Sequence, residues 1–156
     1  MTRPLTRTPE RVGLLLLLVL QPSIGGVQPA PAPATEPRVM SMADIPWGPP
    51  GGGNGYPAGL RTARLGTDPV TGGISYYALF PDGSRFDRHW HTHDEYVVVA
   101  RGTVTITLGE KVHTLGTGAY IVIPGKLSHI WDVPAGEDAV IFVRRAGPAD
   151  FHFVKD

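Results

Sequence analysis

Three of the six histidines in this chain lie within five positions, in the segment HWHTHDE, and two acidic residues follow them directly. Side chains two positions apart on an extended strand point to the same face, so His89 and His91 can direct their rings at one ion. The polar triplet at 92–94 is typical of a turn. Glu95 then opens a second strand, and a hairpin would bring its carboxylate back beside the two imidazoles. Two imidazoles and one carboxylate are a suitable ligand set for Fe(II), Mn, Zn, Ni or Cu.

The elements around this cluster have the pattern of an all-β fold. Short apolar or β-branched runs alternate with gaps that hold Gly, Pro or Asp, which is typical of an antiparallel sandwich or barrel. The segment TVTITL alternates threonine with apolar residues, as a strand with one solvent-exposed face does. Closure into a barrel would also remove exposed sheet edges. The expected strands are 60–65, 74–80, 85–91, 95–101, 103–108, 111–115, 119–123, 128–133, 139–145 and 151–154.

The histidine cluster is part of a longer spaced pattern, G-x5-H-x-H-x3-E-x6-G, over residues 83–102. A second pattern, G-x5-P-x4-H, follows over residues 118–129, after a segment of 15 residues. In this order and at this separation the two patterns resemble the two motifs of the cupin superfamily. The resemblance extends over roughly residues 60–146 and is to the small, single-domain bacterial members.

The resemblance implies a single-domain, cupin-type jelly-roll β-barrel that binds one divalent metal ion. Its ligands would be His89, His91, Glu95 and His129. Three neutral imidazoles and one carboxylate leave a divalent ion with a net charge of about +1, and an octahedral ion held in this way keeps two open positions. Such a centre favours a bidentate oxygen donor, or one oxygen ligand together with dioxygen. The chain departs from the second motif at 124–126, where it has Pro-Gly-Lys, and at Val133, where many members have Asn.

Other side chains near the expected site have simpler interpretations. Trp131 has the strand parity of the second-motif histidine, so it is expected in the interior as core or as a wall of the pocket. His93 is expected to be a solvated turn residue, with proton transfer near the site as the alternative. Arg144 and Arg145 are interpreted as a solvated strand end. The alternative for Arg144 is an inward position facing an anionic substrate.

The N-terminal region predicts export. Three arginines within the first eleven residues precede a short apolar run at 12–20, which is the layout of a secretory signal peptide. That run is about half of the roughly 20 residues that span a bilayer, so no stable membrane anchor is expected. We expect a signal peptide over 1–34, a Pro/Gly-rich arm and loop over 35–59, and a cupin β-barrel domain over 60–156. The expected location is secreted or periplasmic.

Charge and residue types exclude several functions. Basic and acidic residues number 14 each and form no long runs of one sign, which argues against binding to nucleic acid. The chain has no cysteine, so disulfides, thiolate metal sites and cysteine nucleophiles are excluded. It also has no G-x-S-x-G sequence and no Gly-rich loop leading into a helix, which argues against serine hydrolases of that type and against P-loop enzymes.

Two classes of function remain. The expected one is a metal-dependent enzyme that acts on a small oxygenated molecule, of the dioxygenase, isomerase or decarboxylase type. The alternative is a non-catalytic module that binds or senses a small ligand at the same metal site. A closed tetrahedral zinc site, with a structural role only, is a third option. A homodimer is expected for two reasons. Cupins pair through their sheets, and the arm before the barrel is long enough to wrap around a partner.

Overall fold

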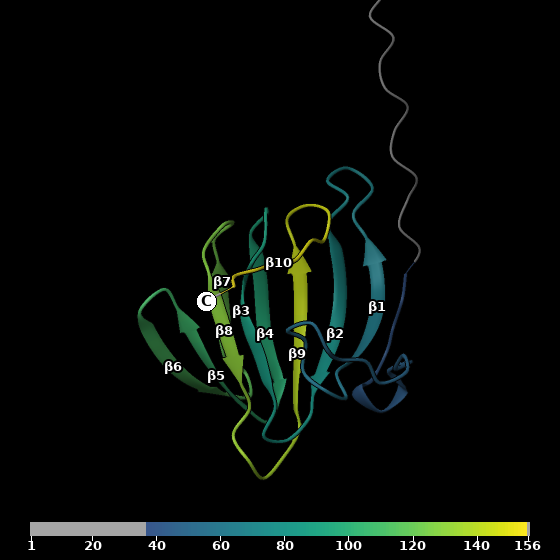
Figure 1. The fold of residues 1–156 in the computed structure, drawn as a ribbon. Helices are drawn as coiled ribbons and strands as arrows, with labels where there is room; N and C mark the ends of the chain where they lie inside the picture. Colours follow the sequence, from purple (N-terminus) through teal and green to yellow (C-terminus); the bar gives the residue numbers. More distant parts are fainter. Residues whose placement is uncertain (1–36, 156) are drawn as a thin grey trace, which may run out of the picture. The chain divides into compact units, whose positions relative to one another are not determined.

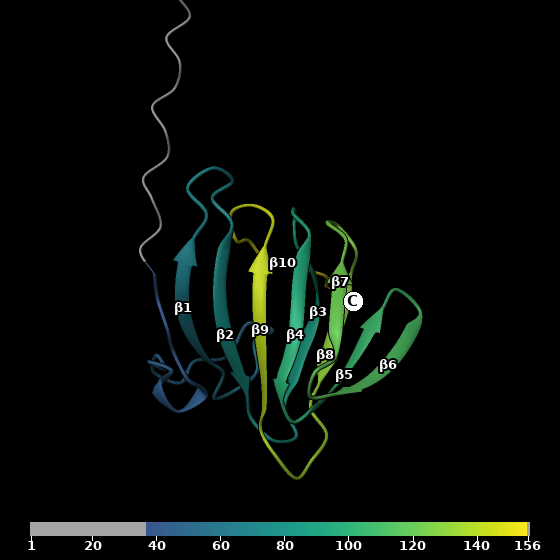
Figure 2. The same ribbon diagram turned by 180° about the vertical axis from the view of Figure 1, so that it is seen from behind.

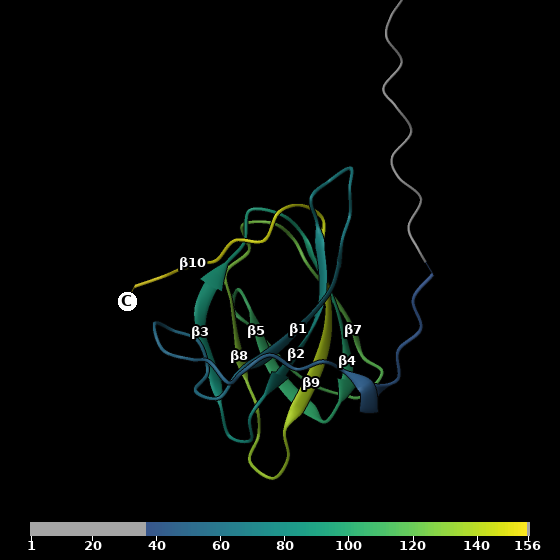
Figure 3. The ribbon, with the colours of Figure 1, turned by 90° about the vertical axis from the view of Figure 1, so that its right-hand side faces the viewer.

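The computed structural model describes residues 37–155, which form two facing antiparallel sheets (Figures 1 and 3). The first sheet has the strand order β1-β2-β9-β4-β7 and is seen in front in Figure 2, and the second has the order β10-β3-β8-β5-β6. This is the all-β jelly roll that the sequence predicts. The strands are β1 Arg61–Thr67, β2 Ile74–Phe80, β3 Arg85–Trp90, β4 Glu95–Arg101, β5 Thr103–Leu108, β6 Lys111–Gly116, β7 Tyr120–Ile123, β8 His129–Asp132, β9 Ala139–Arg145 and β10 His152–Phe153.

Every expected strand is present, and each end lies within two residues of its predicted position. A short 3-10 helix, η1 at Met42–Asp44, precedes the barrel. Across residues 37–155 no helix is both long and apolar enough to cross a membrane. The predicted signal peptide at 1–34 lies outside the described residues.

The core lies between the two sheets and follows from the alternation of side chains along each strand. In β4 the buried positions alternate with half-buried ones, so Val97 and Val99 point inward. In β5 the same alternation buries Val104 and Ile106 from the opposite sheet. Burial of each such side chain stabilises the fold by about 1.5–3 kcal/mol. The two sheets therefore form a rigid frame around the cavity between them.

The arm before β1 folds onto its own barrel. The amide of Gly48 donates to the carbonyl of Thr62 at 2.9 Å, which covers part of the outer edge of β1. Farther along, the amide of Asp87 donates to the carbonyl of Gly55 at 3.0 Å. Gly55 has a φ of +91°, and a Cβ there would clash with the ring of Phe153, so only glycine allows this close approach. The arm thus joins the C-terminal segment at one end of the barrel.

Candidate metal centre

The structure brings the two histidine motifs together through adjacent strands of one sheet. His89 of β3 is paired in register with His129 of β8. His91 follows directly after β3, and Glu95 is the first residue of β4. All four side chains are buried, with 0–3% of each residue exposed.

The predicted hairpin between the histidines and Glu95 is wrong. Strand β3 belongs to one sheet and β4 to the other, so residues 92–94 cross between the two sheets. Glu95 therefore approaches the histidines from the opposite wall of the barrel. The sequence pattern identifies the turn but not the sheet that each strand joins, because that choice depends on pairing with β8 and β9 much later in the chain.

A register irregularity in β3 helps to orient His89. The pairing of β3 with β8 shifts between Phe86 and His89, so both side chains point inward although they are three positions apart. A bulge of this kind changes which face a strand presents. The two rings stack with their centroids 4.1 Å apart, so Phe86 fixes the plane of the imidazole and keeps water from one of its faces.

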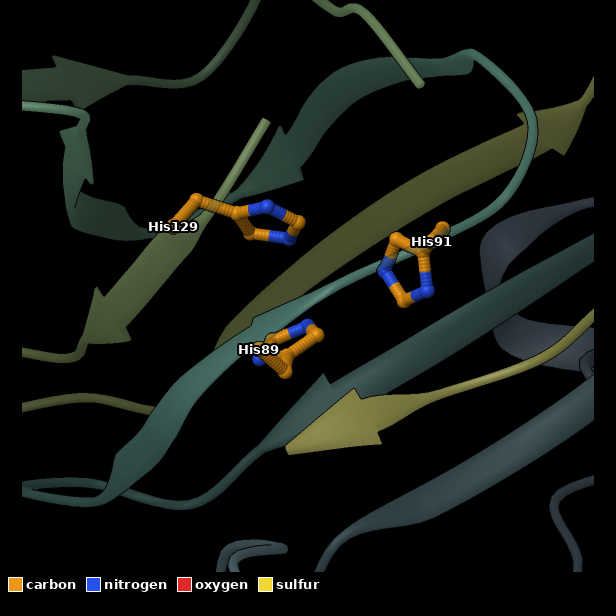
Figure 4. A group of neighbouring side chains, drawn as sticks. All are labelled: His89, His91 and His129. Carbon is orange, nitrogen blue, oxygen red and sulfur yellow. The ribbon is translucent and has the colours of Figure 1, made fainter. Parts of the chain in front are cut away.

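Each of the three imidazoles is held through its Nδ1 atom by a backbone carbonyl. His89 and His129 bond to the carbonyl two residues earlier, at 2.6 Å and 3.0 Å, and His91 bonds to the carbonyl of Asp150 at 2.6 Å. A carbonyl oxygen only accepts, so each Nδ1 carries the hydrogen and each Nε2 keeps a free lone pair. Figure 4 shows the three rings turned toward a common space, and their ligand atoms lie within 4.8 Å of one another. These three buried histidines could hold a metal ion.

Glu95 lies beside two of these histidines. Its Oε2 atom is 3.3 Å from Nε2 of His91 and 3.7 Å from Nε2 of His129. Despite these distances, none of the three atoms has a partner with hydrogen-bond geometry among residues 37–155. A buried polar atom without a partner costs about 1–3 kcal/mol. A cluster of imidazole and carboxylate atoms in this state fits a divalent cation, which would accept a lone pair from each.

The interpretation of both terminal arginines of β9 as solvated is wrong for Arg145, which is only 2% exposed. It is paired in register with Glu95 across the β4–β9 ladder, and its Nη2 atom lies 3.5 Å from Oε1 of Glu95. The same nitrogen donates to the hydroxyl of Tyr76 at 3.3 Å. Arg144, for which an inward position was the alternative, has a side chain 54% exposed and lies 3.5 Å from Asp68. The inward-facing arginine is therefore the neighbour of the one that the sequence suggested.

Burial and neighbouring charges set the protonation states that a metal requires. Desolvation, with a smaller effect of nearby His129, lowers the pKa of His89 to about 3, and desolvation also lowers the pKa of His129. Burial alone would raise the pKa of Glu95, but His91 in its protonated form and the positive charge of Arg145 outweigh this effect and lower the pKa to about 2. At neutral pH His89 and His129 are therefore neutral and Glu95 is ionised. These are the forms that bind a cation.

A cavity of about 270 Å³ opens beside this cluster. His89, His91, Glu95 and Arg145 line one part of it, and the remaining lining is mainly aromatic or aliphatic. Trp131 is 2% exposed and belongs to both the core and the cavity wall, which joins the two expected roles. The aromatic and aliphatic lining residues are Tyr56, Leu60, Ile74, Tyr76, Ala78, Phe80, Phe86, Trp131, Ile141, Ala149 and Phe151.

Asp150 could not be identified from the sequence pattern, because it fixes His91 from 59 positions farther along the chain. The backbone carbonyl of Asp150 bonds to His91, and its side-chain Oδ1 atom accepts a hydrogen bond from the amide of Thr92 at 3.0 Å. Its Oδ2 atom lies 3.0 Å from Nε2 of His152, whose ring stacks on Trp90 with centroids 3.9 Å apart. Asp150 thus fastens the C-terminal segment to the loop that carries His91.

The turn residue His93 is half-buried, and its ring packs against Gly147, where a Cβ would lie 2.5 Å from the ring. It is not among the described residues that line the cavity. Its expected role as a turn residue or a proton carrier stays a prediction.

Comparison with known families agrees with this geometry. The family model described as "Cupin domain" matches residues 76–143, a stretch that contains both histidine motifs and the strands that pair around them. The chain contains a cupin domain. No protein of curated function matches this cupin.

Solved structures resemble this cupin in fold. Rru_A2000 from Rhodospirillum rubrum, a cupin-2 domain, has a TM-score of 0.62 at 15% identity, over 81% of this chain and 86% of that one. The polyketide cyclase RemF from Streptomyces resistomycificus has a TM-score of 0.60 at 15% identity, over 78% and 87%. A cupin-like protein from Thermotoga maritima has a TM-score of 0.54 at 24% identity, over 63% and 80%. At these identities the likeness establishes the fold alone.

Proposed function

We propose that this protein is an exported, metal-dependent cupin enzyme that acts on a small oxygenated molecule. One divalent ion would be held by His89, His91, Glu95 and His129. The observation that carries the proposal is the fixed tautomer of the three imidazoles. Backbone carbonyls occupy every Nδ1, so the free lone pairs on Nε2 meet in one buried space beside the free oxygen of Glu95.

The chain's own residues prepare this space for a ligand. Arg145 engages Oε1 of Glu95 and leaves Oε2 toward the histidines. Phe86 and Phe151 lie against the imidazoles, with ring centroids 4.1 Å from His89 and 4.8 Å from His91, and they exclude water from those faces. When bound, a divalent ion supplies a Lewis acid that polarises an oxygen donor. The adjoining cavity gives a small molecule room to reach it.

Non-catalytic binding is the second candidate, and one observation favours it. Apart from the proposed ligands, the titratable side chains among the described lining residues are two tyrosines and two arginines: Tyr56, Tyr76, Arg64 and Arg145. Burial raises the pKa of Tyr76 to about 12, and it also raises the pKa of Tyr56. Neither group exchanges protons readily at neutral pH, so a general base would have to be a proposed ligand, the substrate or water.

Elemental analysis of the untagged protein tests the proposal. We expect about one metal ion per chain in the wild type and little in the His129→Ala variant. His113→Ala is the matched control, because His113 is exposed on β6 and should leave the metal content unchanged. An unchanged metal content in a folded His129→Ala protein would refute the site.

Water exchange then separates an open site from a closed structural one. With Mn²⁺ loaded, an open coordination position increases the relaxation rate of bulk water protons, whereas a closed site leaves it near the protein background. Turnover assays on the metal-loaded protein distinguish the enzyme from the binding module. Iron or copper in the isolated protein would direct these assays to oxygen chemistry, and zinc would direct them to non-redox reactions.

A further inference from the structure

The cavity combines a positive charge with an aromatic lining, and this combination restricts its ligand. Among the described lining residues, the groups charged at neutral pH are Arg64, Arg145 and Glu95, which give a net charge of +1. A divalent ion at the proposed site raises this charge to +3. A site with this charge and low-dielectric walls attracts anions and repels cations.

Arg145 also has unused donors beside the cavity. Its Nη2 atom is engaged by Tyr76 and lies near Glu95, but Nε and Nη1 are buried without a hydrogen-bond partner among residues 37–155. Arginine nitrogens are strong donors to carboxylate oxygens. Unpaired donors on a buried cation are costly, and an anionic oxygen supplied by a ligand would remove that cost.

The aromatic residues lie close to this cation. The Cζ atom of Arg145 is 5.2 Å from the centre of the Phe151 ring, and that ring is 5.3 Å from the ring of Tyr56. An apolar group that follows an anionic head into the cavity would therefore meet aromatic side chains directly. A cavity of about 150 Å³ accepts benzene in another protein. The volume here, about 270 Å³, fits one ring with a short side group.

We propose that the ligand of this cavity is a small arylcarboxylate or a related organic anion with a single ring. Arg145 is the residue that binds its anionic oxygens beside the metal, and the ring lies against Tyr56, Phe86 and Phe151. Arg64 is exposed at the mouth and attracts the anion toward it. This inference rests on the proposed function for the metal, but the anion selectivity that it predicts belongs to the chain itself.

Calorimetric titration with three probes of similar size tests the inference: phenylacetate, benzyl alcohol and benzylamine. We expect phenylacetate to bind at least about tenfold more tightly than benzyl alcohol, and benzylamine to show no binding. Acetate, which lacks the ring, should bind more weakly than phenylacetate. Equal affinities for phenylacetate and benzyl alcohol in the metal-loaded protein would overturn the inference.

Variants locate the binding to the cavity. Arg145→Lys keeps the charge beside Glu95 but removes the planar donors, and it should weaken the binding of phenylacetate to the metal-free protein by at least about tenfold. Ala149 is exposed at the mouth, so Ala149→Trp should block entry without disturbing the core. Arg101→Gln, at the exposed end of β4, is the control for a lost surface charge and should bind as the wild type does. Wild-type affinity in Ala149→Trp would overturn the inference even if Arg145→Lys failed to fold.

Titration of both the metal-loaded and the chelator-treated protein separates this inference from the proposed function. If metal binds but phenylacetate is not preferred, the metal site stands and the ligand class is wrong. If no metal binds but the metal-free protein prefers phenylacetate and Ala149→Trp abolishes that preference, the ligand class stands and the metal-dependent function is wrong.

Discussion

Replacement of Arg145 by methionine should destabilise the metal-free protein far more than the same change at its neighbour Arg144. Both arginines have an Nη2 atom 3.5 Å from a carboxylate oxygen, of Glu95 and Asp68 respectively. The two pairs differ in burial: the side chains of the first are 1% and 4% exposed, and those of the second are 54% and 30% exposed. At this separation the Coulomb energy is about 5 kcal/mol at an effective dielectric of about 20, and about 1 kcal/mol at the value for water.

Loss of one partner from a buried pair leaves the other charge without compensation and costs about 3–5 kcal/mol. We therefore expect Arg145→Met to lower the free energy of unfolding by that amount. Arg144→Met should lower it by no more than about 1 kcal/mol, which is the range for exposed ion pairs. The double variant Glu95→Gln/Arg145→Met removes both charges and should recover much of the loss.

Urea denaturation in the presence of a chelator measures these differences. The slope of the unfolding free energy against urea should be the same for all variants, so that the midpoints report stability alone. A domain of this kind has a total stability of about 5–15 kcal/mol, so a folded population of Arg145→Met should remain measurable. If the two single variants agreed within about 0.5 kcal/mol at equal slopes, Arg145 would not be held in a buried ion pair.

Three further predictions concern pH, backbone conformation and metal. His89 takes up a proton near pH 6.5 in the unfolded state but only near pH 3 in the folded state. Between these values the unfolded state binds more protons, so the metal-free protein should lose stability as the pH falls through this range. The pKa of Glu95 is lowered from 4.5 to about 2, and this shift extends the loss of stability to lower pH. Equal urea midpoints at pH 7 and pH 4 would contradict the lowered pKa values of both residues. Gly102→Ala should lower the free energy of unfolding by at least about 1 kcal/mol more than Gly118→Ala does. Both glycines have positive φ, but only at Gly102 would a Cβ meet a backbone oxygen, that of Asp138 at 2.7 Å, and equal denaturation midpoints would count against this clash. Metal at about 100 times its dissociation constant should stabilise the wild type by about 2.7 kcal/mol, measured as a shift in the denaturation midpoint that His129→Ala abolishes.

Local pattern was sufficient to predict the strands of this protein. Alternation of apolar and polar residues reports which face of a strand is buried, and glycine, proline and aspartate mark the ends, so the strand boundaries follow from neighbouring residues alone. Alternation along β8 also predicts the inward position of Trp131, which is 2% exposed. It also applies to β9, where Ile141 and Val143 are buried and the next inward position is 145. Strand parity therefore places Arg145 on the inward face, but it does not show that an arginine stays buried there.

Two features of the structure could not be predicted from the alternation of residues along a strand. Arginine is almost never fully buried without a partner, so an arginine pair at a strand end is normally interpreted as solvated. Arg145 is buried because the β4–β9 register places it opposite Glu95, and that register is a property of the assembled sheet. The crossing of residues 92–94 between sheets was missed for a similar reason, since a turn sequence is the same whether the next strand returns to its own sheet or joins another.

The bond between His91 and the carbonyl of Asp150 spans 59 positions of the chain, and this has a consequence for the order of events during synthesis. On a growing polypeptide, both histidine motifs leave the ribosome before Asp150 does. Until then the imidazole of His91 has no carbonyl to fix its tautomer, whereas His89 and His129 already carry theirs two residues upstream. A nascent chain that stops before residue 150 would hold only two of its three imidazoles in place. The candidate metal site is therefore complete only when the segment around Asp150 has folded against the loop that carries His91.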